Sequence, residues 1–155
     1  MPAIILQTLI DAAPEVCFDL SLNIDLHMQS MEQTNEKAVG GRTSGQIKLG
    51  ETVKWKARHF GLYFTMTSLI TDLIRPTRFT DEMTKGPFQH LRHQHIFEKT
   101  PAGTMMTDLF EFQSPFWILG NIADRLFLKR YLRNLLTKRN ELIKNTAERS
   151  KNTPL

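Results

Sequence analysis

Three histidines and two aspartates are the residues of this sequence best suited to chemistry, and all five fall within predicted strands: His59, His93, His95, Asp81 and Asp108. His93 and His95 are two residues apart, so on a strand their side chains share a face. If that face is turned inward, these groups must hydrogen-bond to one another, to water or to a ligand, because burying them unpaired is costly.

Three roles are open to these five residues. They could form a polar network that satisfies itself, or they could anchor the polar part of a ligand in an otherwise apolar pocket. A His–Asp pair could also act in acid–base catalysis on a carbonyl substrate, for which the candidates are His93, His95 and Asp108. Two histidines at this spacing could share a metal ion, but no cluster of Cys or Glu accompanies them. We therefore predict no metal site and no cofactor.

The faces of the strands can be assigned from alternation. Residues 52–59 (TVKWKARH) place Val, Trp, Ala and His on one side and Thr, Lys, Lys and Arg on the other, which predicts a half-buried antiparallel strand. The later strands are assigned in the same way, and helical periodicity adds residues from the C-terminal helix. We expect ligand contacts from Trp55, Ala57, His59, Phe64, Met66, Ser68, Ile70, Phe79, Asp81, Met83, Leu91, His93, His95, Phe97, Met106, Asp108, Phe110, Phe112, Leu119, Ile122, Ala123 and Leu126.

The elements that position these residues follow a simple order. Residues 3–10 form a predicted strand, and a helical pattern then runs from Pro14 to about residue 34, interrupted at Asn23 to give two short helices. Four glycines between residues 39 and 50 indicate a strand with tight turns. Five consecutive strands and one long helix follow, at residues 52–59, 62–74, 78–85, 88–99, 104–113 and 116–147.

This order predicts an α+β fold. The seven strands form a curved antiparallel sheet wrapped around the long C-terminal helix, with the two short helices placed after the first strand. A chain of 155 residues fits one domain, which we place at residues 1–148, followed by a tail at 149–155.

The net charge of +4 is concentrated near the C-terminus, where residues 125–151 carry nine basic side chains and two acidic ones. We interpret this run as the solvated face of a helix and expect no nucleic-acid partner; a helix that docks on a membrane or on nucleic acid is the alternative. No apolar run approaches the roughly 20 residues that span a bilayer, so we expect no integral membrane association. The N-terminus lacks a basic leader. We therefore predict a cytoplasmic protein, monomeric or weakly dimeric.

Several short segments carry a resemblance to a known family. Together they are similar to the polyketide cyclase/START-like superfamily, also called SRPBCC, which has the helix-grip fold of birch pollen allergens. The resemblance runs from the first strand to about residue 140 and is closest to stand-alone bacterial domains, some of which are labelled cell division inhibitors. The segments are residues 55–61 (WKARHFG), 67–71 (TSLIT), 78–82 (RFTDE), 86–88 (GPF), 93–98 (HQHIFE) and 103–108 (GTMMTD).

The resemblance implies a deep cavity between the sheet and the C-terminal helix that holds a lipid, polyketide or aromatic molecule. Members of the superfamily include both carriers and enzymes, so the activity does not follow from the fold. The sequence departs from the family pattern at Leu91, where a bulky Trp is common, and at Trp117, where Gly is common. We expect binding of a small hydrophobic or amphipathic molecule without catalysis; the alternative is a cyclase, aromatase or dehydratase that uses the inward His and Asp residues.

Overall fold

Seven antiparallel strands form one open sheet in the computed structural model, which describes residues 2–114 and 122–153 and, within the latter range, the side chains from residue 125. The sheet order is β1-β7-β6-β5-β4-β3-β2, so β1 and β2 are its edges. The strands are β1 (Ala3–Ile10), β2 (Lys37–Gly41), β3 (Thr52–His59), β4 (Leu62–Ile74), β5 (Arg78–Lys85), β6 (His90–Thr100) and β7 (Gly103–Gln113). The predicted α+β class and number of strands are confirmed.

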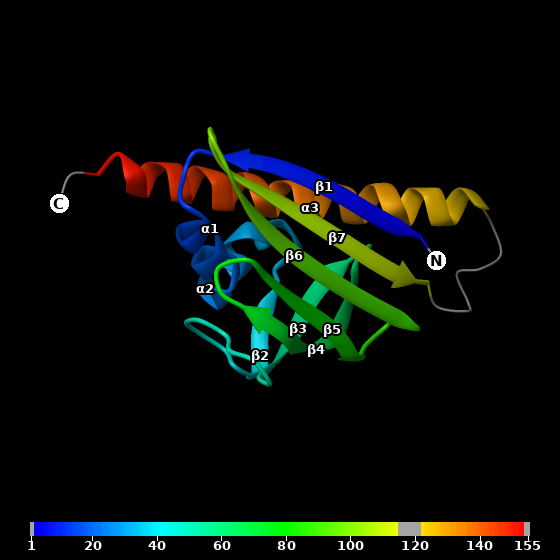
Figure 1. Ribbon diagram of the computed structural model, residues 1–155. Coiled ribbons are helices and arrows are strands. Elements are labelled where there is room, and N and C mark those ends of the chain that lie inside the picture. The colour runs from blue at the N-terminus through cyan, green and yellow to red at the C-terminus, as the bar shows by residue number, and fades with distance from the viewer. Residues whose placement is uncertain (1, 115–121, 154–155) are drawn as a thin grey trace.

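The helices lie where the sequence places them. After β1 come α1 (Pro14–Ser21), α2 (Ile24–Ser30) and a short 3-10 helix (Glu32–Thr34), and the chain ends in α3 (Ile122–Lys151). Pro14 stands in the first turn of α1, and Asn23 separates α1 from α2 by capping the second helix: its Oδ1 accepts a hydrogen bond from the Leu26 amide at 2.9 Å. In Figure 1, α3 runs beside β1 along the length of the sheet, and α1 and α2 lie at one end.

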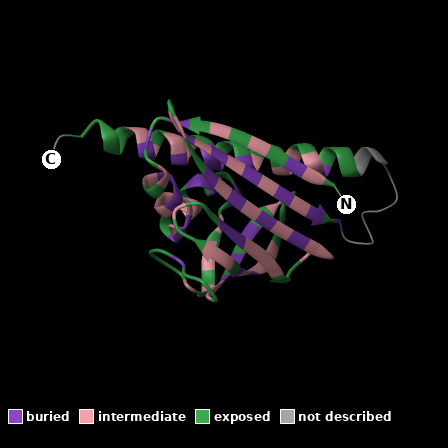
Figure 2. Ribbon diagram, viewed as in Figure 1, coloured by how far each residue is buried: buried purple, intermediate pink, exposed green. Residues whose placement is uncertain are grey.

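The alternation of residue types becomes an alternation of burial. On β6 the side chains at Leu91, His93, His95 and Phe97 are buried and those between them are half-buried, and β7 continues the pattern. Figure 2 shows this as bands along the central strands. The burial pattern thus agrees with the faces predicted for β6 and β7. The long strand β4 changes register against β5 at Thr67/Ser68 and at Ile70/Asp72, and such irregularities bend a strand.

The far end of α3 differs from the prediction. The helix continues to Lys151, so the expected tail at 149–155 begins within it. Contacts with the β1–α1 loop explain the extra turn. Glu148 accepts a hydrogen bond from the Asp11 amide at 3.1 Å, and the Lys151 ammonium lies 2.5 Å from the Asp11 carboxylate. The start predicted near residue 116 lies outside the described residues. None of the helices within the described ranges is long and apolar enough to cross a membrane.

The core divides into two clusters, and this division sets the position of the site. One cluster lies under α1 and α2, where Phe18 packs edge-on against Phe79 and Phe97 with ring centroids 5.5 and 5.4 Å apart. The other joins β1, β6 and β7 to α3 and includes Leu91, Phe112 and other residues. Both clusters involve the face of the sheet that the helices cover, and the region that neither fills is a cavity.

Candidate functional site

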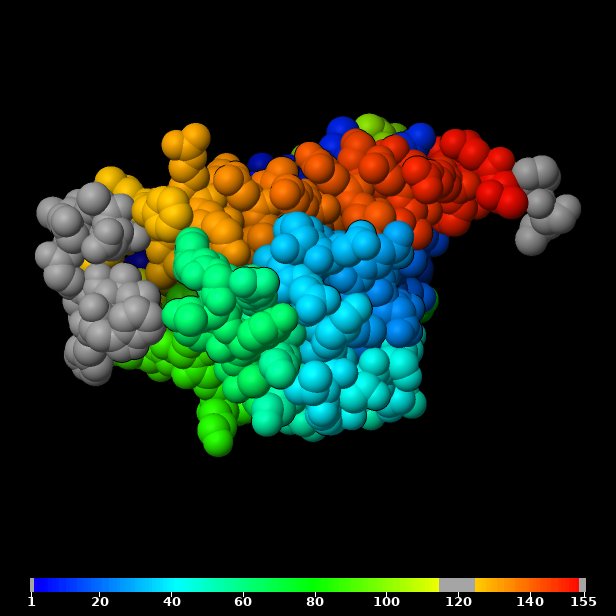
Figure 3. Space-filling model, turned by 180° about the vertical axis from the view of Figure 1, so that it is seen from behind, coloured from blue at the N-terminus to red at the C-terminus, as the bar shows by residue number. Residues whose placement is uncertain are grey.

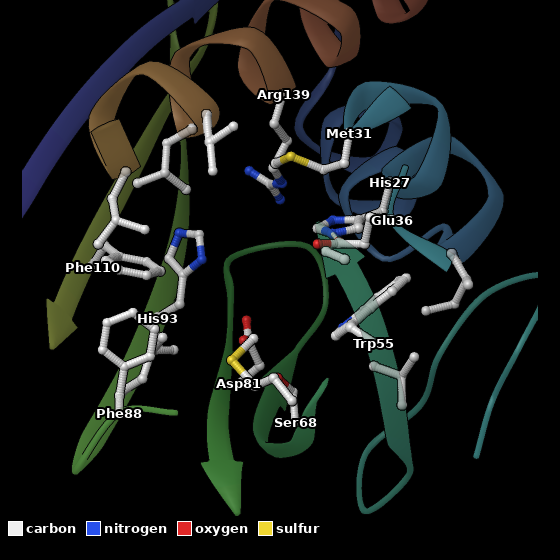
Figure 4. Close-up of a pocket in the computed structure, with 18 of the residues that line it drawn as sticks. His27, Met31, Glu36, Trp55, Ser68, Asp81, Phe88, His93, Phe110 and Arg139 are labelled. Carbon is white, nitrogen blue, oxygen red and sulfur yellow. Dashed lines mark hydrogen bonds and ion pairs between the residues drawn. The ribbon is translucent and has the colours of Figure 1, made fainter. Parts of the chain in front are cut away.

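A cavity of about 260 Å³ lies between the sheet and α3 and is lined mainly by apolar side chains (Figure 4). From behind, α3 is seen to pass above α2 and the β3–β4 hairpin, so the helix forms one wall (Figure 3). Thirteen of the residues expected to contact a ligand line it: Trp55, Ala57, His59, Phe64, Met66, Ser68, Ile70, Phe79, Asp81, Leu91, His93, His95 and Phe110.

Other expected residues lie elsewhere. Phe97 and Met106 face the covered side of the sheet as predicted, but they belong to the core cluster under α1 and α2. Phe112 belongs to the second cluster, Met83 packs against that cluster, and Asp108 lies fully buried beneath the histidines. These side chains are packed in the core or in the polar network and do not line the cavity.

The predicted contribution of the start of α3 is wrong at Leu126, which is 64% exposed. Leu128 is buried instead, and two residues correspond to about 200° around a helix, so the two side chains point in nearly opposite directions. Leu119 and Trp117 lie outside the described residues, as do the side chains of Ile122 and Ala123.

A buried polar network forms one end of the cavity. Nε2 of His93 lies 2.8 Å from Oδ1 of Asp108, and Nε2 of His95 lies 2.9 Å from Oδ2 of Asp81. Both contacts run diagonally between strands, because the register pairs Asp81 with His93 across β5 and β6 and His95 with Asp108 across β6 and β7, and each histidine reaches the carboxylate that is the direct partner of the other histidine. The histidines and aspartates predicted to share a face therefore meet.

Helix α3 completes this network with two residues that the sequence analysis missed. Asn140 donates a hydrogen bond of 2.6 Å to Oδ2 of Asp108, and Nη1 of Arg139 lies 3.3 Å from Oδ1 of the same carboxylate. Both side chains are buried. Arg139 was assigned to a solvated basic face, and that interpretation is wrong for this residue. A signal was present, because Arg139 follows Leu135 by four residues and precedes Ile143 by four, which places it within the apolar stripe.

Burial and hydrogen bonds together set the charges of the network. Burial would raise the pKa of Asp108, but hydrogen bonds from His93 and His95 and the charge of Arg139 outweigh it and hold the pKa well below its usual value. Burial, with the neighbouring His95, lowers the pKa of His93 to about 4. At neutral pH, His93 is therefore a neutral imidazole whose Nε2–H donates to Asp108, which leaves Nδ1 as an acceptor.

Asp81 is ionised for a similar reason and is open to the cavity. Burial would raise its pKa, but the hydrogen bond from His95 and the charge of Arg139 lower it. Its side chain is 21% exposed, and it lines the cavity. This end of the cavity therefore presents a carboxylate.

A second polar group lies on the opposite side of the cavity in Figure 4, beside Trp55. Nε2 of His27 on α2 is 2.6 Å from Oε1 of Glu36, and the His27 ring stacks on Trp55 with centroids 4.4 Å apart. Periodicity placed α2 correctly but gave no reason to select His27 or Glu36. The cavity has polar groups at two ends and apolar walls between them.

A third contact closes the side of the cavity near the β3–β4 turn. Nδ1 of His59 is 2.7 Å from the hydroxyl of Tyr131 on α3. Phe60, 59% exposed, packs over Tyr131 with ring centroids 4.7 Å apart. The hairpin and the helix therefore meet through aromatic side chains at this point.

Comparison with solved structures identifies the architecture. Ginseng major latex-like protein 151 from Panax ginseng is 14% identical and superimposes with a TM-score of 0.66, covering 94% of this chain and 97% of its own. The di-domain ARO/CYC StfQ from the steffimycin biosynthetic pathway is also 14% identical, with a TM-score of 0.77 over 97% of this chain and 52% of StfQ. The chain has the helix-grip fold of SRPBCC-type proteins.

The helix-grip fold is shared with a bacterial structure of nearly the same length. A protein from Thermus thermophilus is 14% identical, with a TM-score of 0.73 over 94% of this chain and 99% of the other. At such identities the likeness concerns the fold alone. Comparison of the sequence with family models gives no match, and comparison with curated proteins gives none either.

Proposed function

We propose that this protein binds a small hydrophobic or amphipathic molecule in the cavity between the sheet and α3, without catalysing a reaction on it. The observation that carries the proposal is the cavity itself, whose walls are apolar and whose polar groups gather at its ends. Most small-molecule sites combine apolar walls with a few convergent polar groups. The helix-grip fold, shared with a latex-like protein and with an ARO/CYC protein, agrees with a ligand-binding role.

The size of the cavity limits the ligand. Its volume of about 260 Å³ lies just below the roughly 300–1,000 Å³ that is usual for ligand pockets. That volume corresponds to roughly nine water molecules at about 30 Å³ each, which favours a bicyclic aromatic molecule or a medium-length acyl chain over a sterol. A polar group on the ligand would meet Asp81 and Nδ1 of His93.

The test is displacement of an uncharged, environment-sensitive naphthalene dye by medium-chain alcohols and bicyclic phenols. Ala57 lines the cavity and is buried, so Ala57→Leu should fill part of the space and weaken binding by tenfold or more. The control is Arg58→Leu, which introduces the same leucine side chain on the exposed face of the same strand and should leave binding unchanged. Equal affinity in wild type and Ala57→Leu, or no displacement by any of these compounds, would contradict the proposal.

The His93–Asp108 pair favours a second function, acid–base catalysis on a carbonyl substrate. The imidazole is held by the carboxylate at 2.8 Å, and His93 lines the cavity. This arrangement orients a general base. Under this alternative, His93→Gln should abolish turnover of a polyketide-like substrate while leaving its binding within about threefold. This alternative would be excluded if the wild type showed no turnover and His93→Gln only lost substrate binding.

A further inference from the structure

Asp81, His93 and His95 form a compact set of metal-ligating groups at the polar end of the cavity. One ligand atom from each residue lies within 4.8 Å of the other two. Two adjacent strands hold them: Asp81 is the register partner of His93, and His95 follows two residues later on the same face of β6. The positions of the three side chains are thus fixed by the sheet and do not depend on a loop.

The orientation of both imidazoles is set from behind by one carboxylate. Oδ1 of Asp108 lies 2.8 Å from Nε2 of His93 and 3.1 Å from Nδ1 of His95. The other nitrogen of each ring, Nδ1 of His93 and Nε2 of His95, is left for the cluster. Within the described part of the chain, Nδ1 of His93 has no hydrogen-bond partner. A carboxylate behind a metal-binding histidine is the usual arrangement that fixes its ring and its tautomer.

His95 has a carboxylate at each of its two nitrogens. Nε2 is 2.9 Å from Asp81, and Nδ1 is 3.1 Å from Asp108. A neutral imidazole has one N–H and can donate to only one of them. Nη2 of Arg139 also lies 3.3 Å from Nδ1, so both nitrogens have partners when the proton is on Nε2. In the other tautomer Nδ1–H donates to Asp108, and Nε2 offers its lone pair to a cation placed between His95 and Asp81.

The charges around the cluster sum to a negative value, which favours the binding of a cation. The carboxylates of Asp81 and Asp108 carry two negative charges, and Arg139 supplies one positive charge. Arg139 lies against Asp108 and Asn140, with its Nη1 3.3 Å from the carboxylate and 2.9 Å from Oδ1 of Asn140. The positive charge of the guanidinium therefore compensates the negative charge of Asp108, and the negative charge of Asp81, at the cavity surface, remains in excess.

We propose that Asp81, His93 and His95 bind a divalent transition-metal ion, such as Zn²⁺ or Fe²⁺, whose remaining coordination positions face the apolar cavity. Two imidazoles and one carboxylate are a ligand set that these ions accept, with positions left for water or substrate. The inference goes beyond the proposed function, because the ion would select ligands whose polar group is a carboxylate, a carbonyl or a hydroxyl oxygen.

The test uses the full chain without an affinity tag, stripped of metal by a chelator. Zn²⁺ is titrated by calorimetry, and Co²⁺ is titrated by visible absorption. The wild type should bind one ion per chain. His93→Gln retains an N–H that can reach Asp108 but loses Nδ1, and Asp81→Asn removes the carboxylate. Each should weaken binding by about 100-fold or more, since even the loss of an outer partner costs 10- to 100-fold.

His27→Gln is the matched control, because His27 lines the same cavity outside the cluster. It should bind Zn²⁺ and Co²⁺ as the wild type does. His95→Asn, which retains an N–H near Asp108, serves as a second variant if His93→Gln does not fold, as judged by circular dichroism. Failure of the folded wild type to bind either ion at one equivalent overturns the proposal, and so does wild-type affinity in the folded ligand variants or an equal loss in His27→Gln.

The dye displacement assay, repeated on the metal-free protein, separates this inference from the proposed function. Displacement by alcohols or phenols without any metal binding would leave the cavity as a ligand site and contradict the metal site. Binding of one metal ion without displacement would support the metal site and remove the hydrophobic ligand.

Discussion

Arg139, in the middle of the basic helix α3, lies with its Nη1 3.3 Å from Oδ1 of Asp108, a carboxylate on β7 that is 0% exposed. The guanidinium is itself 4% exposed and also approaches Nδ1 of His95 at 3.3 Å. A charged residue from the helix thus neutralises a charged residue of the sheet, and the contact holds α3 against the polar end of the cavity. The pair and the strand register together position the candidate site.

Replacement of Arg139 by Met should be strongly destabilising. Met fills a similar volume but leaves the buried Asp108 without its cation, and breaking a buried ion pair from one side costs about 3–5 kcal/mol. Lys138→Met, one residue earlier on the exposed face, should change stability by no more than about 0.5 kcal/mol. Urea denaturation of both variants provides the measurement. Similar midpoints for the two would show that Arg139 does not hold the network together.

His59 should make the protein less stable in mild acid. Burial lowers its pKa, with the charge of Glu36 opposing in part, and its Nδ1 contacts the Tyr131 hydroxyl. Because the unfolded chain has a His pKa of about 6.5, it binds more protons than the folded chain as the pH falls below that value. The contribution of His59 is thus fully present above pH ~6.5 and declines below it, by at most about 1.4 kcal/mol per pH unit.

The measurement is the free energy of unfolding at pH 7.5 and at pH 5.5, for the wild type and for His59→Gln. Gln cannot take up a proton, so the variant should lose less stability between the two pH values than the wild type. An equal loss in both proteins would assign the acid sensitivity to other groups.

The fold could be predicted from local patterns because a strand and a helix each impose a period on the sequence. On β3, the alternation from Thr52 to His59 places Trp55 and Ala57 inward, and the structure buries both. The break at Asn23 could also be predicted locally, since a short polar side chain can cap a helix. The C-terminal end of α3 could not, because Lys151 is held by Asp11, a residue 140 positions away in the sequence.

The candidate site could be predicted only in part. Period two decides that Phe97 and Ile70 face inward, but it cannot decide which of them is covered by α1 and which borders the cavity, because that depends on how distant helices pack. For Arg139, its charge favoured the solvent while its spacing from Leu135 and Ile143 favoured the core. The spacing was the better guide, because a basic residue is stable in the interior when a carboxylate is there to pair with it.

Removal of the Leu91 side chain should enlarge the cavity and lower stability. Leu91 is 3% exposed, lines the cavity and packs in the cluster with Phe112. Leu→Ala substitutions in cores cost about 2–5 kcal/mol, whereas Ile5→Ala, on the exposed face of β1, should cost far less. Leu91→Ala should also admit a larger competitor in the dye assay than the wild type does. A destabilised variant with unchanged ligand preference would show that Leu91 does not limit the size of the ligand.

Trp55 should report directly on what enters the cavity. Its side chain lines the cavity, is 7% exposed, and stacks against His27 with ring centroids 4.4 Å apart. The sequence contains one other tryptophan, so Trp117→Phe leaves Trp55 as the sole indole. Because this indole is largely removed from water, its emission should lie at shorter wavelength than that of free tryptophan and return to the free value on unfolding in urea. A bicyclic phenol that occupies the cavity should change the emission intensity in proportion to the dye it displaces, and His27→Gln should alter the starting intensity by removing the stacked ring. Emission of Trp55 that stays constant while the dye is displaced would place the ligand outside this cavity.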